Sequence, residues 1–77
     1  MRARVYVTLK PGVHDPAGKA VAHGLHALGY PEIHEVRIGK FFEVELDDGP
    51  DAMERLRRAA DQLLANPVIE NYRVELG

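Results

Sequence analysis

The residues best suited to hold a nucleotide phosphate stand in the loop from Gly12 to Lys19, where two glycines precede a lysine. Phosphate-binding loops of this kind use backbone N–H groups to cradle phosphates and a Ser or Thr after the lysine to bind magnesium. Here the glycines are one residue too far apart, Ala20 follows the lysine, and Pro16 lacks an N–H group. The loop is therefore not expected to bind phosphate.

The histidines and acids show no catalytic or metal-binding pattern. His23 and His26 are close enough on a helix to share a metal ion, but no carboxylate or cysteine joins them at ligand spacing. The chain has no serine or cysteine and a single threonine, Thr8, so it offers little for nucleophilic catalysis. A turn and a solvent-exposed strand face explain the acids at 43–48. We therefore expect no catalytic residue, no metal site and no cofactor in this chain.

Basic side chains beside turns are the first candidates for contact with a partner protein. One group, at 10–15, follows the first stretch in which apolar and polar residues alternate. The other group, at 37–40, surrounds a glycine near the middle of the chain. The arginine at 37 is expected to project from the face opposite the core, and the lysine at 40 to lie in a turn. The candidate contact residues are Lys10, Pro11, Gly12, Asp15, Arg37, Gly39 and Lys40.

Three aromatic residues, which could belong to the core or to an interface, are the second group of candidates: Tyr6, Phe41 and Tyr72. Tyr6 and Phe41 fall on the strand phase opposite to the one expected to be buried. Exposed aromatic side chains are typical of protein–protein interfaces. We therefore favour an interface for Tyr6 and Phe41.

The elements that position these residues follow from the spacing of apolar side chains. Alternation from residue 3 to residue 10 predicts a strand with one buried face, which Pro11-Gly12 ends. Asp15 and Pro16 then open a helix, as a capping carboxylate and a proline in its favoured first position. The predicted apolar face of this helix consists of Ala17, Ala20, Val21, Gly24, Leu25 and Leu28.

A second helix is predicted after the acids, glycine and proline at 47–50, and Asn66-Pro67 ends it. A final strand follows, in which apolar and polar residues alternate from 72 to 76. The apolar face of the second helix is expected to consist of Met53, Leu56, Ala60, Leu63 and Leu64.

The stretch from 33 to 47 allows two interpretations. A three-residue loop, Gly39-Lys40-Phe41, would make a hairpin that pairs Ile38 with Phe42 and Val36 with Val44. One long strand bent at the glycine fits the same alternation but exceeds the usual length of about 3–10 residues. We favour the hairpin.

The predicted order is β-α-β-β-α-β in a single domain over residues 1–77. This order is typical of an α+β, ferredoxin-like two-layer sandwich with both helices on one face of an antiparallel sheet. A domain this short has a thin stability margin, and its edge strands can pair between copies. We therefore expect a homodimer or a higher homo-oligomer.

Composition excludes several classes of protein. The net charge of −2 and the pI near 6.0 give no basic field for nucleic acid. No apolar run approaches the roughly 20 residues of a membrane span, and the N-terminus lacks the apolar block of a signal peptide. We therefore expect neither nucleic acid nor membrane as a partner, and a cytoplasmic location.

Several segments together resemble the PurS family, and the resemblance covers nearly the whole chain. The first is Thr8 to Val13 with Asp15-Pro16 and Gly18 to Val21, and the second is Val36 to Lys40, which contains an Arg-x-Gly-Lys pattern. The others are Leu25 with Leu28 to Tyr30, and Leu63 to Glu70 with Tyr72. His14 departs from the aliphatic residue expected in its place.

The resemblance implies a subunit rather than a catalyst. PurS proteins are the small subunit of phosphoribosylformylglycinamidine (FGAM) synthase, a ligase complex of purine biosynthesis. In this family a glutaminase subunit releases ammonia, a synthetase subunit uses ATP and magnesium, and the small subunit bridges the two as a dimer. From the resemblance we also expect Lys10, Arg37 and Lys40 to contact the synthetase subunit. The alternative is a small ferredoxin-like regulatory module that binds a ligand, since fold alone does not decide function.

Overall fold

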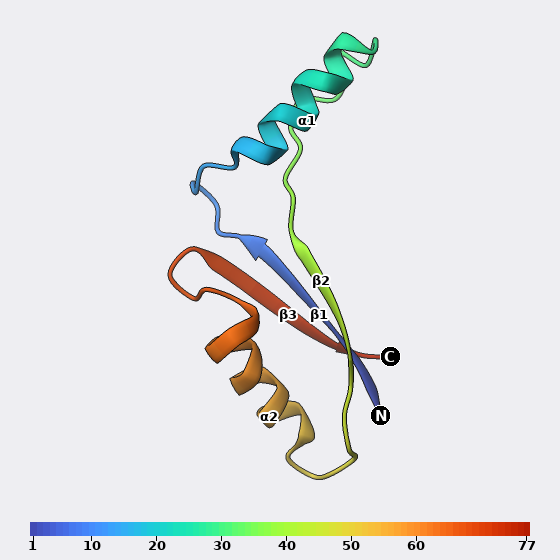
Figure 1. Cartoon of the computed structure of the whole chain (residues 1–77), viewed down its shortest axis with the longest axis vertical. Helices are drawn as coiled ribbons and strands as arrows, with labels where there is room; N and C mark the ends of the chain where they lie inside the picture. Colours follow the sequence, from blue (N-terminus) through green and yellow to red (C-terminus); the bar gives the residue numbers. More distant parts are fainter.

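Three antiparallel strands form one sheet in the computed structural model, which describes residues 1–77. The order across the sheet is β2-β1-β3 (Figure 1). The strands are β1 (Arg2–Leu9), β2 (Lys40–Glu45) and β3 (Glu70–Leu76); the helices are α1 (Pro16–Ala27) and α2 (Ala52–Ala59), which continues into the π-helical turn η1 (Ala60–Leu64). The α+β class and the antiparallel sheet predicted from the sequence are thus confirmed.

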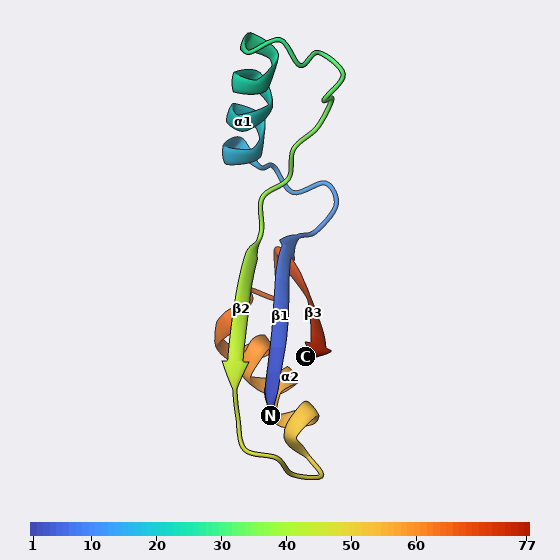
Figure 2. The same ribbon diagram turned by 90° about the vertical axis from the view of Figure 1, so that its right-hand side faces the viewer.

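The core lies between α2 and one face of the sheet. Strand β1 is central, and its predicted alternation is confirmed because Ala3, Val5 and Val7 are fully buried. Leu56 and Ala60 pack against them. The two views of the ribbon show α2 on one face of the sheet (Figures 1 and 2). Only nine of the 77 residues are buried, so the core of a single chain is small.

The π-helical turn corrects the predicted apolar face of the second helix. Leu63 was expected beside Leu56 and Ala60, but its side chain is 84% exposed. The Ala65 N–H donates to the Ala60 carbonyl, five residues back, at 2.8 Å. This wider turn inserts one residue into the helical repeat, which rotates Leu63 towards solvent. Leu64 packs against the core, as predicted, and Ala65, which was not predicted for this face, is part of the core.

Helix α1 does not lie on the sheet, contrary to the prediction that both helices cover one face. It extends beyond the end of the strands together with the extended segment 33–39, and we call residues 10–39 the arm (Figure 2). The molecule measures 49 × 25 × 14 Å, with a radius of gyration of 15.8 Å, whereas a compact chain of this length would have about 11.5 Å. The apolar face predicted for this helix is therefore not used to cover the sheet.

The predicted hairpin at 39–41 is absent as well, because the chain runs straight from the arm into β2. Lys40 already pairs with Val7 of β1, and a Cβ atom on Gly39 would come within 3.0 Å of the Val7 carbonyl oxygen. The glycine therefore permits a close approach of two backbones rather than a turn. The alternative of one continuous extended segment describes the path better, although only 40–45 is a strand.

Neither α1 nor α2 has the length and the apolar composition that a membrane-spanning helix requires.

Candidate subunit interface

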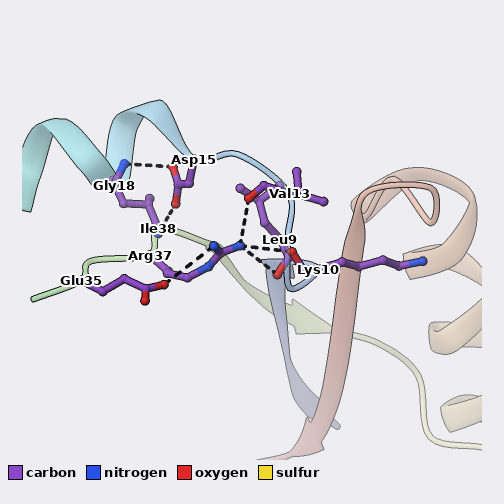
Figure 3. A network of polar contacts seen from close by, with 8 residues as sticks. All are labelled: Leu9, Lys10, Val13, Asp15, Gly18, Glu35, Arg37 and Ile38. Atoms are coloured by element: carbon purple, nitrogen blue, oxygen red, sulfur yellow. Dashed lines mark hydrogen bonds and ion pairs between the residues drawn. The ribbon is translucent and has the colours of Figure 1, made fainter.

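Arg37 lies where the arm joins the sheet and binds the loop that leaves β1. Its Nη2 donates to the carbonyl oxygens of Leu9, Lys10 and Val13 at 3.5, 3.2 and 3.4 Å (Figure 3). Its Nη1 lies 3.9 Å from a carboxylate oxygen of Glu35. A planar guanidinium can satisfy several acceptors at once, which a lysine ammonium at this position could not do with the same geometry.

Asp15 also links the loop after β1 to the extended segment that contains Arg37. One carboxylate oxygen accepts from the Gly18 N–H at 2.9 Å and caps α1, as predicted. The other oxygen accepts from the Ile38 N–H, also at 2.9 Å (Figure 3). We call Asp15 and Arg37 the clasp, because they hold segment 36–38 of the arm beside segment 9–15.

The two backbone N–H donors lower the pKa of the Asp15 carboxyl, that of Ile38 more than that of Gly18, and the positive charge of Arg37 adds to the effect. Since the ionised form is favoured in the folded chain, its contribution to stability is complete above the ordinary aspartate pKa. That contribution is lost as the pH falls through the lowered pKa of the folded chain.

The difference in thermal stability between the native chain and Asp15→Asn is therefore expected to be largest near neutral pH and to shrink in strong acid. Melting temperatures of both chains measured from neutral pH down to about pH 2 test this. Asp61→Asn, at an exposed position of η1, is the matched control, for which we expect no such trend. A difference between native and Asp15→Asn that is constant over the range would contradict the assignment.

Lys10 and Lys40 also have partners within the chain. The Lys10 Nζ donates to the Pro67 carbonyl oxygen at 2.7 Å, and the Lys40 Nζ lies 3.7 Å from Glu70. Glu70 in turn accepts from the Asn66 N–H at 2.7 Å. Both lysines therefore fasten the segment that enters β3. Pro11 and Gly12 lie exposed in the turn after β1, at the start of the arm.

The open face of the sheet carries the aromatic candidates. Tyr6 and Phe41 are opposite each other in neighbouring strands, with ring centroids 5.1 Å apart, and the guanidinium carbon of Arg73 lies 4.5 Å from the centroid of the Tyr6 ring. Phe41 is 51% exposed. The predicted phase of both aromatics is confirmed, whereas Tyr72 lies on the opposite face and packs against the core. Arg73 was not among the candidates, although it alternates in phase with the polar side of β3.

The arm exposes most of the apolar residues that were expected to be buried. Val21 is 43% and Leu28 76% exposed. The buried residues of α1 are Gly18, which lies against the Val36 carbonyl oxygen, and Ala22. The His26 Nε2 lies 2.6 Å from the Ile33 carbonyl oxygen, so His26 ties the two parts of the arm together. One apolar side of the arm is thus without a partner in the single chain.

A hollow of about 330 Å³ lies between the start of α1 and the extended segment of the arm. It is open to solvent and would be the first place to look for a small ligand. No group of three or more His, Asp or Glu side chains is placed to hold a metal ion. The residues around the hollow are Gly12, Val13, His14, Asp15, Lys19, Ala22, His34, Glu35, Val36 and Arg37.

Comparison with known proteins gives one consistent answer over the whole chain. The sequence model of the family described as "PurS: Phosphoribosylformylglycinamidine (FGAM) synthase" matches residues 2–77. The PurS subunit of Synechocystis is 53% identical over 75 residues, which are 95% of this chain and 75% of that protein. The PurS subunit of Bacillus subtilis is 43% identical over 76 residues, which are 97% of this chain and 90% of that protein.

Solved structures agree with the sequence comparison. The structure of B. subtilis PurS superposes with a TM-score of 0.89 at 44% identity and covers 96% of this chain and 94% of that one. A chain from the structure of PurLQS from Thermotoga maritima gives a TM-score of 0.83 at 28% identity, with 96% and 93% covered. Because almost the whole chain superposes on these protomers, the arm is part of the shared fold. The chain therefore belongs to the PurS family of phosphoribosylformylglycinamidine synthase subunits.

Proposed function

We propose that this chain is the small subunit of phosphoribosylformylglycinamidine synthase, the complex that converts formylglycinamide ribonucleotide to its amidine with ATP and glutamine. The match of the family over residues 2–77 carries this proposal. The full-length likeness to a chain of the Thermotoga PurLQS structure supports a place in such a complex. The alternative, a regulatory ligand-binding module, has no comparable support.

In this proposal the chain bridges the glutaminase and synthetase subunits and supports the transfer of ammonia between them. ATP and magnesium bind to the synthetase subunit, and the complex works in the cytoplasm. The chain supplies surfaces rather than reacting groups. The open sheet face with Tyr6 and Phe41 has the composition of an interface centre, since exposed aromatics beside an arginine are typical of binding hot spots.

Product formation by purified synthetase and glutaminase subunits, with and without this chain, tests the role. With glutamine as the nitrogen source, synthesis should fall to near the background when the chain is left out. With free ammonia, synthesis should depend on the chain little or not at all, because no transfer between subunits is needed. Equal rates with and without the chain under both conditions would contradict the proposal.

The basic candidates need a separate test, because their contacts within the chain do not exclude contacts with another subunit. Lys10→Ala, Arg37→Ala and Lys40→Ala are each expected to weaken assembly with the synthetase subunit. Assembly measured by gel filtration of the mixed subunits checks this, with Glu32→Ala on the exposed part of the arm as control. Unchanged assembly of all three variants would refute their place at that interface.

We also propose that the chain forms a homodimer in which the arms are exchanged. The outer edge of β2 has no neighbour, and segment 33–38, which was expected to fill it, points away from it in the same chain. The unpaired N–H and C=O groups of such an edge can be paired by the same segment of a second copy. This exchange costs little free energy, because the contacts between the two chains are those that one chain could have made within itself. The apolar side of α1 supports the same arrangement.

In the exchanged dimer, segment 33–38 of a second copy lies beside β2, and its α1 lies beside α2. Each half of the dimer then has four strands and two helices on one face, in the ferredoxin-like arrangement predicted from the sequence. Light scattering tests the association: the expected mass is twice the 8.6 kDa of one chain. A clean single-chain mass at micromolar concentration would refute it.

A further inference from the structure

Segment 33–38 could reach the free edge of β2 in two ways. In a closed chain it would fold back through a loop at 39–41 and pair with β2 of its own chain. In an open chain it continues straight on, and the edge of β2 is left for a second copy. Both forms offer the same strand to the same edge, so the pairing itself does not choose between them.

The clasp exists only in the open chain. Closing the hairpin would move Val36 from beyond Gly39 to a place opposite Val44, a shift of about 26 Å along the sheet at about 3.3 Å per residue. The bonds of Arg37 to the carbonyl oxygens of Lys10 and Val13, and of Asp15 to the Ile38 N–H, could not survive that shift. Each of them is a charge-assisted hydrogen bond.

Two glycines fit the same open junction. A Cβ atom on Gly18 would come within 3.0 Å of the Val36 carbonyl oxygen, and a Cβ atom on Gly39 within 3.0 Å of the Val7 carbonyl oxygen. The absence of a side chain at Gly18 lets α1 lie against the extended segment. The absence of a side chain at Gly39 lets the same segment pass close to the end of β1. Asp15, Gly18 and Arg37, which Figure 3 labels, therefore build one junction together with Gly39.

We infer that the clasp of Asp15 and Arg37 holds the chain open and thereby determines that the edge of β2 is filled by a second copy and not by the chain itself. The inference rests on the proposed exchanged dimer and names the residues that direct it. Asp15 and Arg37 act as positioning residues: they set the path of the arm, and the surfaces that meet in the dimer lie elsewhere.

Cysteine cross-linking can distinguish the two forms, because the native chain contains no cysteine. In the hairpin register that pairs Val36 with Val44, the exposed residues Glu35 and Glu45 are opposite each other. In Glu35→Cys/Glu45→Cys, a disulfide joins two chains if the arms are exchanged and lies within one chain if the hairpin is closed. A non-reducing gel after mild oxidation at low protein concentration separates the two products by mass.

With the clasp intact, we expect almost all cross-links to join two chains. Adding Asp15→Asn and Arg37→Gln, which remove the charges at nearly constant size, should raise the share of cross-links within one chain by about tenfold. The control is Lys19→Gln with Glu32→Gln, which makes the same changes of charge at exposed arm positions. Arg37→Lys alone keeps the charge but not the planar donor geometry and should give an intermediate share.

The inference would be overturned if the share of cross-links within one chain were equal in the clasp variant and the control. Circular dichroism must show that both chains are folded. If the double variant does not fold, the comparison of Arg37→Lys with the control decides in the same way. Light scattering of the same samples separates this result from a failure of the dimer itself. A native-clasp chain that is monomeric and cross-linked within one chain would refute both the exchanged dimer and the inference.

Discussion

Leu56→Ala is expected to lower the free energy of unfolding by about 2–5 kcal/mol, whereas Leu63→Ala should change it by less than about 0.5 kcal/mol. The two leucines are two helical turns apart and would share one face of a regular α-helix. In the structure the side chain of Leu56 is 5% exposed in the core and that of Leu63 is 84% exposed. The difference arises from the π-helical turn between them.

Urea denaturation of the two variants and the native chain measures this difference. For so small a core, a loss of this size is a large part of the total stability, so Leu56→Ala should be substantially unfolded at moderate urea concentrations. The experiment pairs each variant with the other as its control, because the chemical change is the same. Equal losses for both variants would show that Leu63 is buried in solution and that the turn does not rotate it outwards.

Leu28→Asp is expected to weaken the proposed homodimer by about 100-fold or more, with little effect on the fold of a single chain. Leu28 is 76% exposed in the single chain and lies on the side of α1 that also exposes Val21. Burial of a leucine is worth about 1.5–3 kcal/mol, and a carboxylate in an apolar contact costs more, which together give this factor.

Sedimentation at several concentrations measures the dissociation constant, and circular dichroism checks the fold. His23→Asp places the same charge on the opposite side of the helix, at an exposed position, and should leave the dimer intact. If both substitutions weaken the dimer equally, charge alone is responsible. If neither does, this side of α1 lies outside the dimer interface, and the exchange of arms is wrong.

The sequence predicted the local elements well where one residue pattern decided them. Alternation along Ala3, Val5 and Val7 depends only on the twofold repeat of a strand, and it located β1 and its buried face correctly. Asp15 and Pro16 marked the start of α1 in the same way. Tyr6 and Phe41 were assigned to the open face by the same repeat, and the structure brings their rings together.

The failures of prediction concern contacts between segments far apart along the chain. Gly39 suggested a turn because glycine permits turns, but here it permits a close approach to Val7, which no local pattern reveals. Leu63 was misplaced because a π-helical turn shifts the repeat by one residue without a clear local signal. The second bond of Asp15, to the Ile38 N–H, spans 23 residues, so the sequence could identify the cap but not the clasp.

The arm described above also has a consequence for the lifetime of the assembly. Two chains that meet only through their surfaces can dissociate in one step. Chains with exchanged arms must first break the pairing of segment 33–38 with the partner's β2 and the packing of α1 against the partner. Dissociation then proceeds at the rate of this local unfolding. Two differently tagged pools of the protein, mixed after purification, should therefore form mixed dimers slowly, and much faster once warming or mild denaturant loosens the arms.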